Sequence, residues 1–229
     1  MASMKYSTVI LISLLSCSLP LPRLFAEPEW KLVTTTDDIK VWTREKERTS
    51  IKEVKTTGLI DARSWRVLKV ISDHDHYSEF MPYTKESRIL EKNGNVVYFY
   101  TRVAPPLISE RDYTIKLVST AIPGKSGHFV TEFSQANSKG PSGKKGVVRV
   151  ETVSGYWRLE PAEGGEKTSL TYYVFTSPGG AVPGNLANKA NTQTVPGIIK
   201  AVRERVRLKQ YACQNGTESD CEDWMEIAK

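Results

Sequence analysis

The sequence has 229 residues, of which 39% are hydrophobic and 25% are charged, which suits one domain with a core of its own. The formal net charge is +6, and two of the basic residues, Lys5 and Arg23, lie in the leader described below. A basic excess this small, spread along the chain, argues against nucleic-acid binding but suits contact with an anionic membrane surface. We expect a monomer with no nucleic-acid partner and no cofactor.

Residues 1–26 are typical of a secretory leader. Their apolar run over residues 9–15 is shorter than the about 20 residues that a membrane-spanning helix needs. Two outcomes stay open: cleavage near Ala26, which we favour, or lipidation of Cys17 in a lipobox-like sequence. Both predict an exported protein, periplasmic or secreted, and in the second case one anchored at Cys17.

After the leader we expect one domain over residues 27–210 and a tail over 211–229. The tail holds Cys213 and Cys221, and two cysteines this close in an exported chain favour a disulfide. A redox or metal site is the weaker alternative, because the spacing does not match a CxxC motif and no histidine is near.

Alternation and turn residues predict an antiparallel sheet with two helices, an α+β fold. A helix is expected over 62–72 with Asp61 as its N-cap, followed by a loop over 73–82. The final helix is expected over 185–209, with a kink or break at Pro196. Its apolar stripe falls on every fourth residue: Leu186, Ala190, Thr194, Ile198, Val202 and Val206. The predicted strands are 39–45, 53–60, 87–90, 96–103, 113–120, 128–134, 147–159 and 169–176.

Alternate residues of these strands face one side, where the long helix would cover them. They predict either the wall of a cavity or an ordinary solid core, and threonine and tyrosine hydroxyls among them favour a cavity slightly. The wall predicted from this pattern, with Ile198 and Val202 of the helix stripe, comprises Val97, Phe99, Thr101, Val103, Tyr113, Ile115, Leu117, Phe129, Thr131, Phe133, Val148, Val150, Thr152, Trp157, Leu159, Tyr172 and Tyr173.

The run Asp73-His74-Asp75-His76 suggests a metal site, but two histidines at positions i and i+2 do not share a helical face and no third ligand cluster is available. We therefore expect no metal. The sequence contains no GxSxG motif, and only His128 remains as a possible base, so nucleophilic catalysis is not indicated.

Several short motifs resemble, in their order and spacing, the START superfamily, most closely its small, often exported bacterial branch. They are Trp30-Lys31-Leu32, Ile39-Lys40-Val41-Trp42-Thr43-Arg44, His76-Tyr77-Ser78-Glu79-Phe80-Met81-Pro82-Tyr83, Ser109-Glu110-Arg111-Asp112-Tyr113, Gly146-Val147-Val148-Arg149, Gly155-Tyr156-Trp157-Arg158-Leu159, Ser177-Pro178-Gly179-Gly180 and Val195-Pro196. The resemblance implies a helix-grip fold, a curved antiparallel sheet wrapped around the C-terminal helix. It also implies noncatalytic binding and transfer of a lipid in the tunnel between them.

The resemblance further implies that Arg111 sits in the cavity, where its guanidinium offers donors to a ligand. Sterol-binding relatives pair this arginine with an acid on the preceding strand, and the run 97–102 has none. This leaves Asp112 or a more distant carboxylate as partner. The alternative is that Arg111 and Asp112 only form a structural ion pair.

In this family the loop that follows the strand over 96–103 lies at the tunnel mouth. Here it carries Pro106, Leu107 and Ile108. We expect these residues, with Val182, to form a lid that dips into a bilayer, or else to fold back on the core. The hairpin tip over 138–145 carries Lys139, Lys144 and Lys145, and it either meets anionic headgroups or is simply solvated.

A second function stays open, because related folds include polyketide cyclases and fold alone does not set the chemistry. In a cyclase or aromatase, Arg111, Tyr113 and Tyr98 or Tyr100 would polarise a carbonyl and transfer a proton. The leader argues against this, since polyketide intermediates are carried inside cells.

Overall fold

The computed structural model describes residues 29–106 and 108–212. The leader with its two predicted outcomes, Leu107, and the cysteines at 213 and 221 lie outside the described residues, so what the sequence indicates about them stays a prediction.

The described chain forms one ten-stranded sheet. Its order is β1-β2-β3-β10-β9-β7-β6-β5-β4, and the short β8 pairs with β6 off this path. The β6–β8 pairing is parallel, and the others are antiparallel. The strands are β1 (Lys31–Thr36), β2 (Ile39–Arg44), β3 (Glu53–Ile60), β4 (Thr84–Asn93), β5 (Val96–Val103), β6 (Arg111–Ala121), β7 (Phe129–Gln135), β8 (Val148–Arg149), β9 (Thr152–Ala162) and β10 (Lys167–Ser177).

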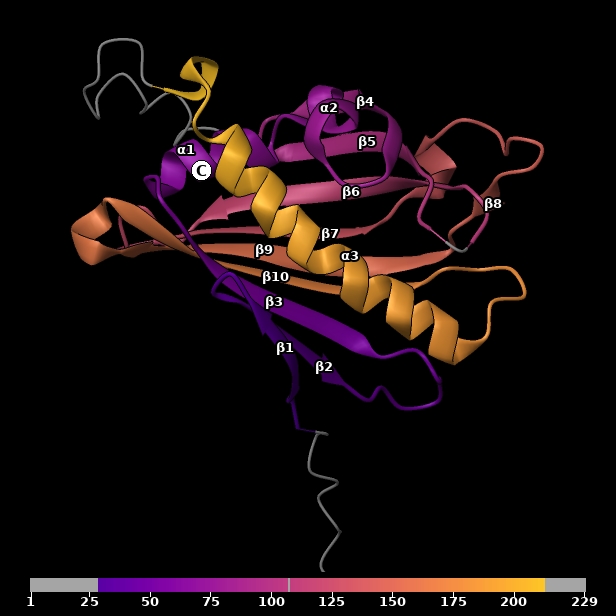
Figure 1. Cartoon of the computed structure of the whole chain (residues 1–229). Helices are drawn as coiled ribbons and strands as arrows, with labels where there is room; N and C mark the ends of the chain where they lie inside the picture. Colours follow the sequence, from indigo (N-terminus) through magenta and orange to yellow (C-terminus); the bar gives the residue numbers. More distant parts are fainter. Residues whose placement is uncertain (1–28, 107, 213–229) are drawn as a thin grey trace, which may run out of the picture.

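One long helix, α3 (Gly184–Arg205), lies across one face of this sheet, which we call the inner face (Figure 1). The shorter α1 (Ser64–Ile71) packs near the C-terminal end of α3. This arrangement confirms the predicted α+β helix-grip fold. None of the helices in the described ranges is long and apolar enough to cross a membrane.

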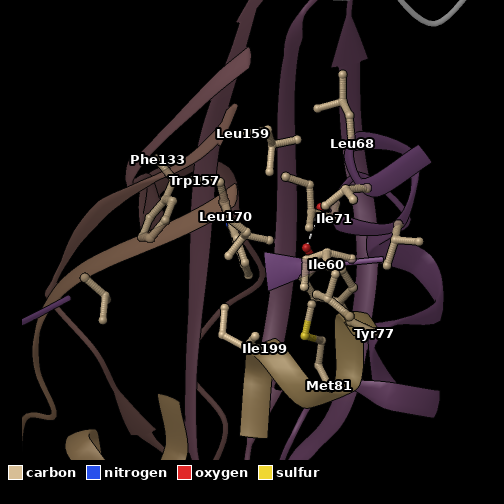
Figure 2. Close-up of a cluster of buried hydrophobic side chains, with 14 of the residues drawn as sticks. Ile60, Leu68, Ile71, Tyr77, Met81, Phe133, Trp157, Leu159, Leu170 and Ile199 are labelled. Atoms are coloured by element: carbon tan, nitrogen blue, oxygen red, sulfur yellow. Dashed lines mark hydrogen bonds between the residues drawn. The ribbon is translucent and has the colours of Figure 1, made fainter. Parts of the chain in front are cut away.

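An apolar core fills the space between sheet and helices at the end near α1. Ile60 of β3, Leu170 of β10 and Ile199 of α3 have no exposed surface, and Leu68 and Ile71 of α1 are buried beside them. Figure 2 shows these five side chains lying together. Burying such side chains contributes roughly 1.5–3 kcal/mol each, so this end of the domain stabilises the fold.

The N-terminal half of the structure departs from the sequence prediction in three places. The first is β1 (Lys31–Thr36), which is not among the predicted strands and whose residues are all exposed, so they show no alternation. The predicted N-cap at Asp61 is wrong: α1 begins at Ser64, and its N-cap residue is Arg63, which makes no side-chain capping bond. The predicted loop over 73–82 contains the 3-10 turn η1 (His74–His76) and the short helix α2 (Tyr77–Phe80). These turns are too short to show a helical period in sequence.

Two further predictions concern the C-terminal half. The run 147–159 is not one strand, because it pairs first with β6, where Val150 N donates to the Asp112 carbonyl oxygen (3.0 Å), and then with β7 and β10. Alternation cannot show such a change of partner. Of the kink or break predicted at Pro196, the break is wrong, since α3 continues through this residue to Arg205.

Three further 3-10 turns complete the described chain. They are η2 (Asn137–Lys139), η3 (Glu163–Gly165) and η4 (Lys209–Tyr211). In η4 the buried Tyr211 hydroxyl accepts from Arg205 Nε (2.7 Å) and donates to the Asp73 carboxylate. The end of α3 is thereby tied to the segment that precedes α2.

Candidate functional site

A cavity of about 200 Å³ lies between α3 and the inner face, beyond the apolar core. Strands β5, β6, β7, β9 and β10 form one side, and the middle of α3 and the segment 77–84 lie opposite. The loops after β5, after β8 and after β10 complete the wall with Pro105, Ile108, Val150 and Pro178. The residues at its rim include Tyr83, which is 45% exposed. The domain thus has a solid end and a hollow end.

Most residues predicted to line a cavity do so. Alternate strand positions point to the same face, and β5 and β6 are adjacent, so their inward side chains meet across one wall. The predicted residues found in the wall are Phe99, Thr101, Val103, Ile108, Arg111, Tyr113, Ile115, Leu117, Phe133, Val150, Trp157, Tyr172 and Ile198. Whether they contact a ligand stays a prediction.

The other predicted residues lie outside the cavity wall: Val97, Phe129, Thr131, Val148, Thr152, Leu159, Tyr173 and Val202. Tyr173 follows Tyr172 on β10 and therefore faces the opposite side of the sheet, where its hydroxyl donates to the Glu53 carboxylate (2.6 Å). Phe129 and Val202 are fully enclosed in the apolar core. Thr131 is buried, and its hydroxyl shares a hydrogen bond with that of Ser119 (2.9 Å). Strand alternation predicts which face of the sheet a side chain lies on, but not where along the strand the cavity ends. In this structure the cavity ends where the apolar core around α1 begins.

The predicted lid divides between two places. Ile108 lines the cavity, and Pro106 is exposed in the same loop without contributing to the wall. Val182 does not reach the cavity: it packs with Phe175 and Ala187 in a separate small cluster. The prediction that one lid includes both Ile108 and Val182 is therefore wrong in its geometry.

The segment 77–84, most of which lies in the predicted loop over 73–82, supplies a part of the wall. Its Met81 and Pro82 line the cavity, and Pro82 lies against α3, since a Cβ on Gly197 would approach Pro82 to 3.1 Å. The signal was the aromatic motif over 76–83, which has no periodicity. Ala190 and Thr194 of the predicted helix stripe also line the cavity. The other unpredicted wall residues are Tyr77, Tyr83, Thr84, Pro105, Val153, Val174, Thr176, Pro178, Asn191 and Val195.

Tyr83 stands at the rim in a left-handed backbone conformation, with φ of 58°. A bulky residue rarely adopts this conformation, which costs of order 1 kcal/mol or more and is often found at binding sites. Its carbonyl oxygen accepts from Ala104 N (2.8 Å), which ties the segment 77–84 to the loop after β5. The rim is thus built from two segments held together by backbone.

Arg111 is the first residue of β6 and points inward from the rim. It is 3% exposed, and it donates from Nε to the Pro178 carbonyl oxygen (3.0 Å) and from Nη1 to the Ser109 carbonyl oxygen. It therefore joins the loop after β5 to the loop before α3. Burial lowers the pKa of Arg111, since a charged group loses hydration there.

Asp112 does not pair with Arg111, so the predicted ion pair between them is wrong. Neighbouring strand residues point to opposite faces, and Asp112 lies on the outer face. There its carboxylate accepts from Arg149 Nε (2.7 Å) and Nη2 (3.2 Å) and from the Tyr100 hydroxyl (3.1 Å). Burial and this carboxylate raise the pKa of Tyr100 to about 12.

Two tyrosine hydroxyls add polarity to the cavity. Tyr113 and Tyr172 both line it, and neither hydroxyl has a hydrogen-bond partner among the described residues. Burial raises the pKa of Tyr113 to about 12, and burial together with the nearby Tyr113 raises the pKa of Tyr172 further. Both are therefore neutral donors at physiological pH, available to a bound polar group.

The histidines at 74 and 76 do not meet at a metal site. The His74 ring is buried, stacks on Tyr77 with centroids 5.0 Å apart, and packs edge-on to Phe99. His76 Nδ1 lies 2.6 Å from the Asp73 carboxylate. In the described part of the chain no three histidine, cysteine, aspartate or glutamate side chains gather as a metal ion would require.

Comparison with known proteins agrees with this geometry. The chain is 26% identical to the human phosphatidylcholine transfer protein over 194 residues, which cover 83% of this chain and 86% of that protein. Among solved structures it superposes with TM-score 0.72 and 27% identity on a STAR-related lipid transfer protein from Xanthomonas axonopodis, covering 78% of this chain and 99% of that one. The human StAR-related lipid transfer protein 5 shares the fold, with TM-score 0.70 and 15% identity, covering 78% and 86% of the two chains.

A family model described as "Polyketide cyclase / dehydrase and lipid transport" matches residues 60–203. This range runs from the end of β3 to the last turn of α3 and includes most of the cavity wall. The chain therefore belongs to this polyketide cyclase/dehydrase and lipid transport family, within the START superfamily.

Proposed function

We propose that this protein holds a lipid or similar hydrophobic molecule in the cavity and carries it between membranes without changing it chemically. The observation that carries the proposal is the hollow end of the domain: the wall is mostly apolar, with a few polar groups, and reaches the surface at Tyr83. Ligand pockets have this composition. The names of the relatives, which state lipid transfer, support the same activity.

The rim offers a surface for membrane contact. Ile108 and the exposed Pro106 lie in one loop, and β8 runs beside it because Val148 N donates to the Glu110 carbonyl oxygen (2.9 Å). The tip that precedes β8 exposes Lys144 and Lys145. An apolar loop flanked by cations suits transient docking on an anionic bilayer. We place this exchange outside the cytoplasm, on the strength of the leader-like residues 1–26.

The cyclase alternative finds less support. Among the described residues that line the cavity there is no aspartate, glutamate, histidine, lysine or cysteine, so the wall lacks a group that titrates near neutral pH. A general acid or base works best with a pKa near the working pH. Tyr113, with a pKa raised to about 12, is far from this range.

Copurification and transfer test the proposal. Native mass spectrometry of the protein from its own source should show a bound apolar mass, and the delipidated protein should move a labelled lipid between vesicles. Thr194 lines the cavity, whereas its neighbour Gln193 is exposed. Thr194→Trp should therefore reduce transfer at least tenfold, while Gln193→Trp on the same helix should leave it unchanged.

The thermal unfolding of both variants serves as the control for folding. A protein that carries no apolar mass and transfers none, or a Thr194→Trp variant that transfers as fast as the wild type while folded, would contradict the carrier function.

A further inference from the structure

The cavity wall has an unbalanced charge. Of the described residues that line it, Arg111 is the only one with a charged side chain. It is 3% exposed, so water screens its charge poorly. A buried charge is stable only when it is paired and hydrogen-bonded, so the partners of this guanidinium decide what the cavity can hold.

The acids closest in sequence to Arg111 are engaged elsewhere. Asp112 pairs with Arg149 on the outer face, and Glu110 pairs with Arg102. The partners that the structure gives Arg111 are the carbonyl oxygens of Ser109 and Pro178, which are neutral. Within the described residues the positive charge in the cavity thus has no carboxylate to balance it.

The same two hydrogen bonds fix the orientation of the guanidinium. They use one N–H of Nε and one of Nη1, and an arginine has five N–H donors. The remaining donors have no partner among the described residues. Tyr113 follows two positions later on β6 and lines the same cavity, with its hydroxyl also unpartnered. A preset guanidinium and a neutral hydroxyl together suit a group with two or more oxygen acceptors.

Resting on the proposed function, we propose that the cavity selects amphiphiles with an acidic head group, a carboxylate or a phosphate, which neutralises Arg111 and accepts from Tyr113. The apolar tail would extend along the wall toward Trp157 and Ile198. A zwitterionic choline head would bring a second cation into a wall without a carboxylate, so we expect it to be excluded. The ligand class would then differ from the phosphatidylcholine in the name of the human relative.

Matched ligand pairs test this selection on the delipidated full chain at about pH 8. Palmitate is compared with hexadecanol, and lysophosphatidate with lysophosphatidylcholine, each by displacement of a fluorescent single-chain probe. We expect the acidic member of at least one pair to bind at least tenfold more tightly than its partner. The two pairs separate a carboxylate preference from a phosphate preference.

Two substitutions then test whether Arg111 is the source of the preference for an acidic head group. Arg111→Gln should reduce the difference in affinity within the preferred pair to less than about twofold. The acidic ligand loses its ion pair with the guanidinium, whereas the affinity for the neutral ligand changes little. Arg102→Gln, which removes a cation from the outer face of the adjacent strand, should retain the full preference. If Arg111→Gln does not fold, the wild-type comparison still decides.

Equal binding of acidic and neutral ligands by the wild type would overturn the inference while leaving the carrier function intact. A preference that survives in a folded Arg111→Gln variant would overturn it as well. Binding of none of the four ligands or the probe would instead count against the proposed function itself.

Discussion

The buried His74 should make the unfolding free energy of the domain depend on pH. Its ring is fully enclosed, Nδ1 lies 2.6 Å from the Ser72 carbonyl oxygen, and Nε2 has no partner within the described chain. Burial lowers the pKa of His74 from 6.5 to about 4. Because the folded pKa lies below the unfolded value, the stabilisation is complete above pH 6.5 and is lost as the pH falls toward 4.

The magnitude follows from this shift. With 1.36 kcal/mol per pKa unit, lowering the pH from 7 to 5 should cost about 2 kcal/mol of unfolding free energy through this one residue. His74→Phe keeps a ring against Tyr77 but does not titrate. Urea unfolding of delipidated protein at both pH values should therefore show the wild type losing about 2 kcal/mol more than the variant.

Comparing the two pH values within each protein removes the constant cost of the substitution. Subtracting the loss of the variant from that of the wild type then removes the contribution of His76, which both proteins share; its pKa is raised by its bond to Asp73, and its contribution has the opposite sign. If the wild type and His74→Phe lost the same free energy between pH 7 and pH 5, the assignment of a neutral, buried His74 would be refuted.

Two further predictions concern packing and charge. Arg149→Met should lower the unfolding free energy, measured in urea, by about 3 kcal/mol, because the carboxylate of Asp112, 1% exposed, then stays buried without its cation. Arg88→Met, at an exposed ion pair, should lower it by less than about 1 kcal/mol. Equal losses in the two variants would contradict a stabilising buried pair. Gly155→Ala should cost more than about 2 kcal/mol, since its Cβ would overlap the Tyr173 carbonyl oxygen and the Phe133 ring. At Gly143 a Cβ meets no atom within 4 Å, so Gly143→Ala should change the unfolding free energy by less than about 0.5 kcal/mol.

Sequence patterns predicted the sheet well because alternation is a local property. On β5 and β6, the period of two placed Phe99 and Ile115 in the cavity wall. It could not show that Phe129, on the same face, would meet the apolar core instead of the hollow, since that depends on where α1 packs. The pairing of Arg111 with Ser109 and Pro178 was equally invisible, because backbone carbonyls carry no sequence signal.

The apolar stripe predicted on the last helix shows why a spacing of four residues does not follow one face of a long helix. Each step of four residues turns an α-helix by about 40° beyond a full turn, so the five steps from Leu186 to Val206 turn the stripe by roughly 200°. The structure accordingly leaves Leu186 half-buried and buries Val195 and Ile199. Thr194 and Ile198, one position earlier, line the cavity.

The separation of a packed region around Ile60 and Ile199 from an open region around Arg111 has an evolutionary consequence. If the cavity carries a ligand as proposed, substitutions near the rim would change which ligand is accepted and would leave the packed residues untouched. Lineages with this architecture can therefore diversify their specificity by small steps, without passing through unstable ancestors.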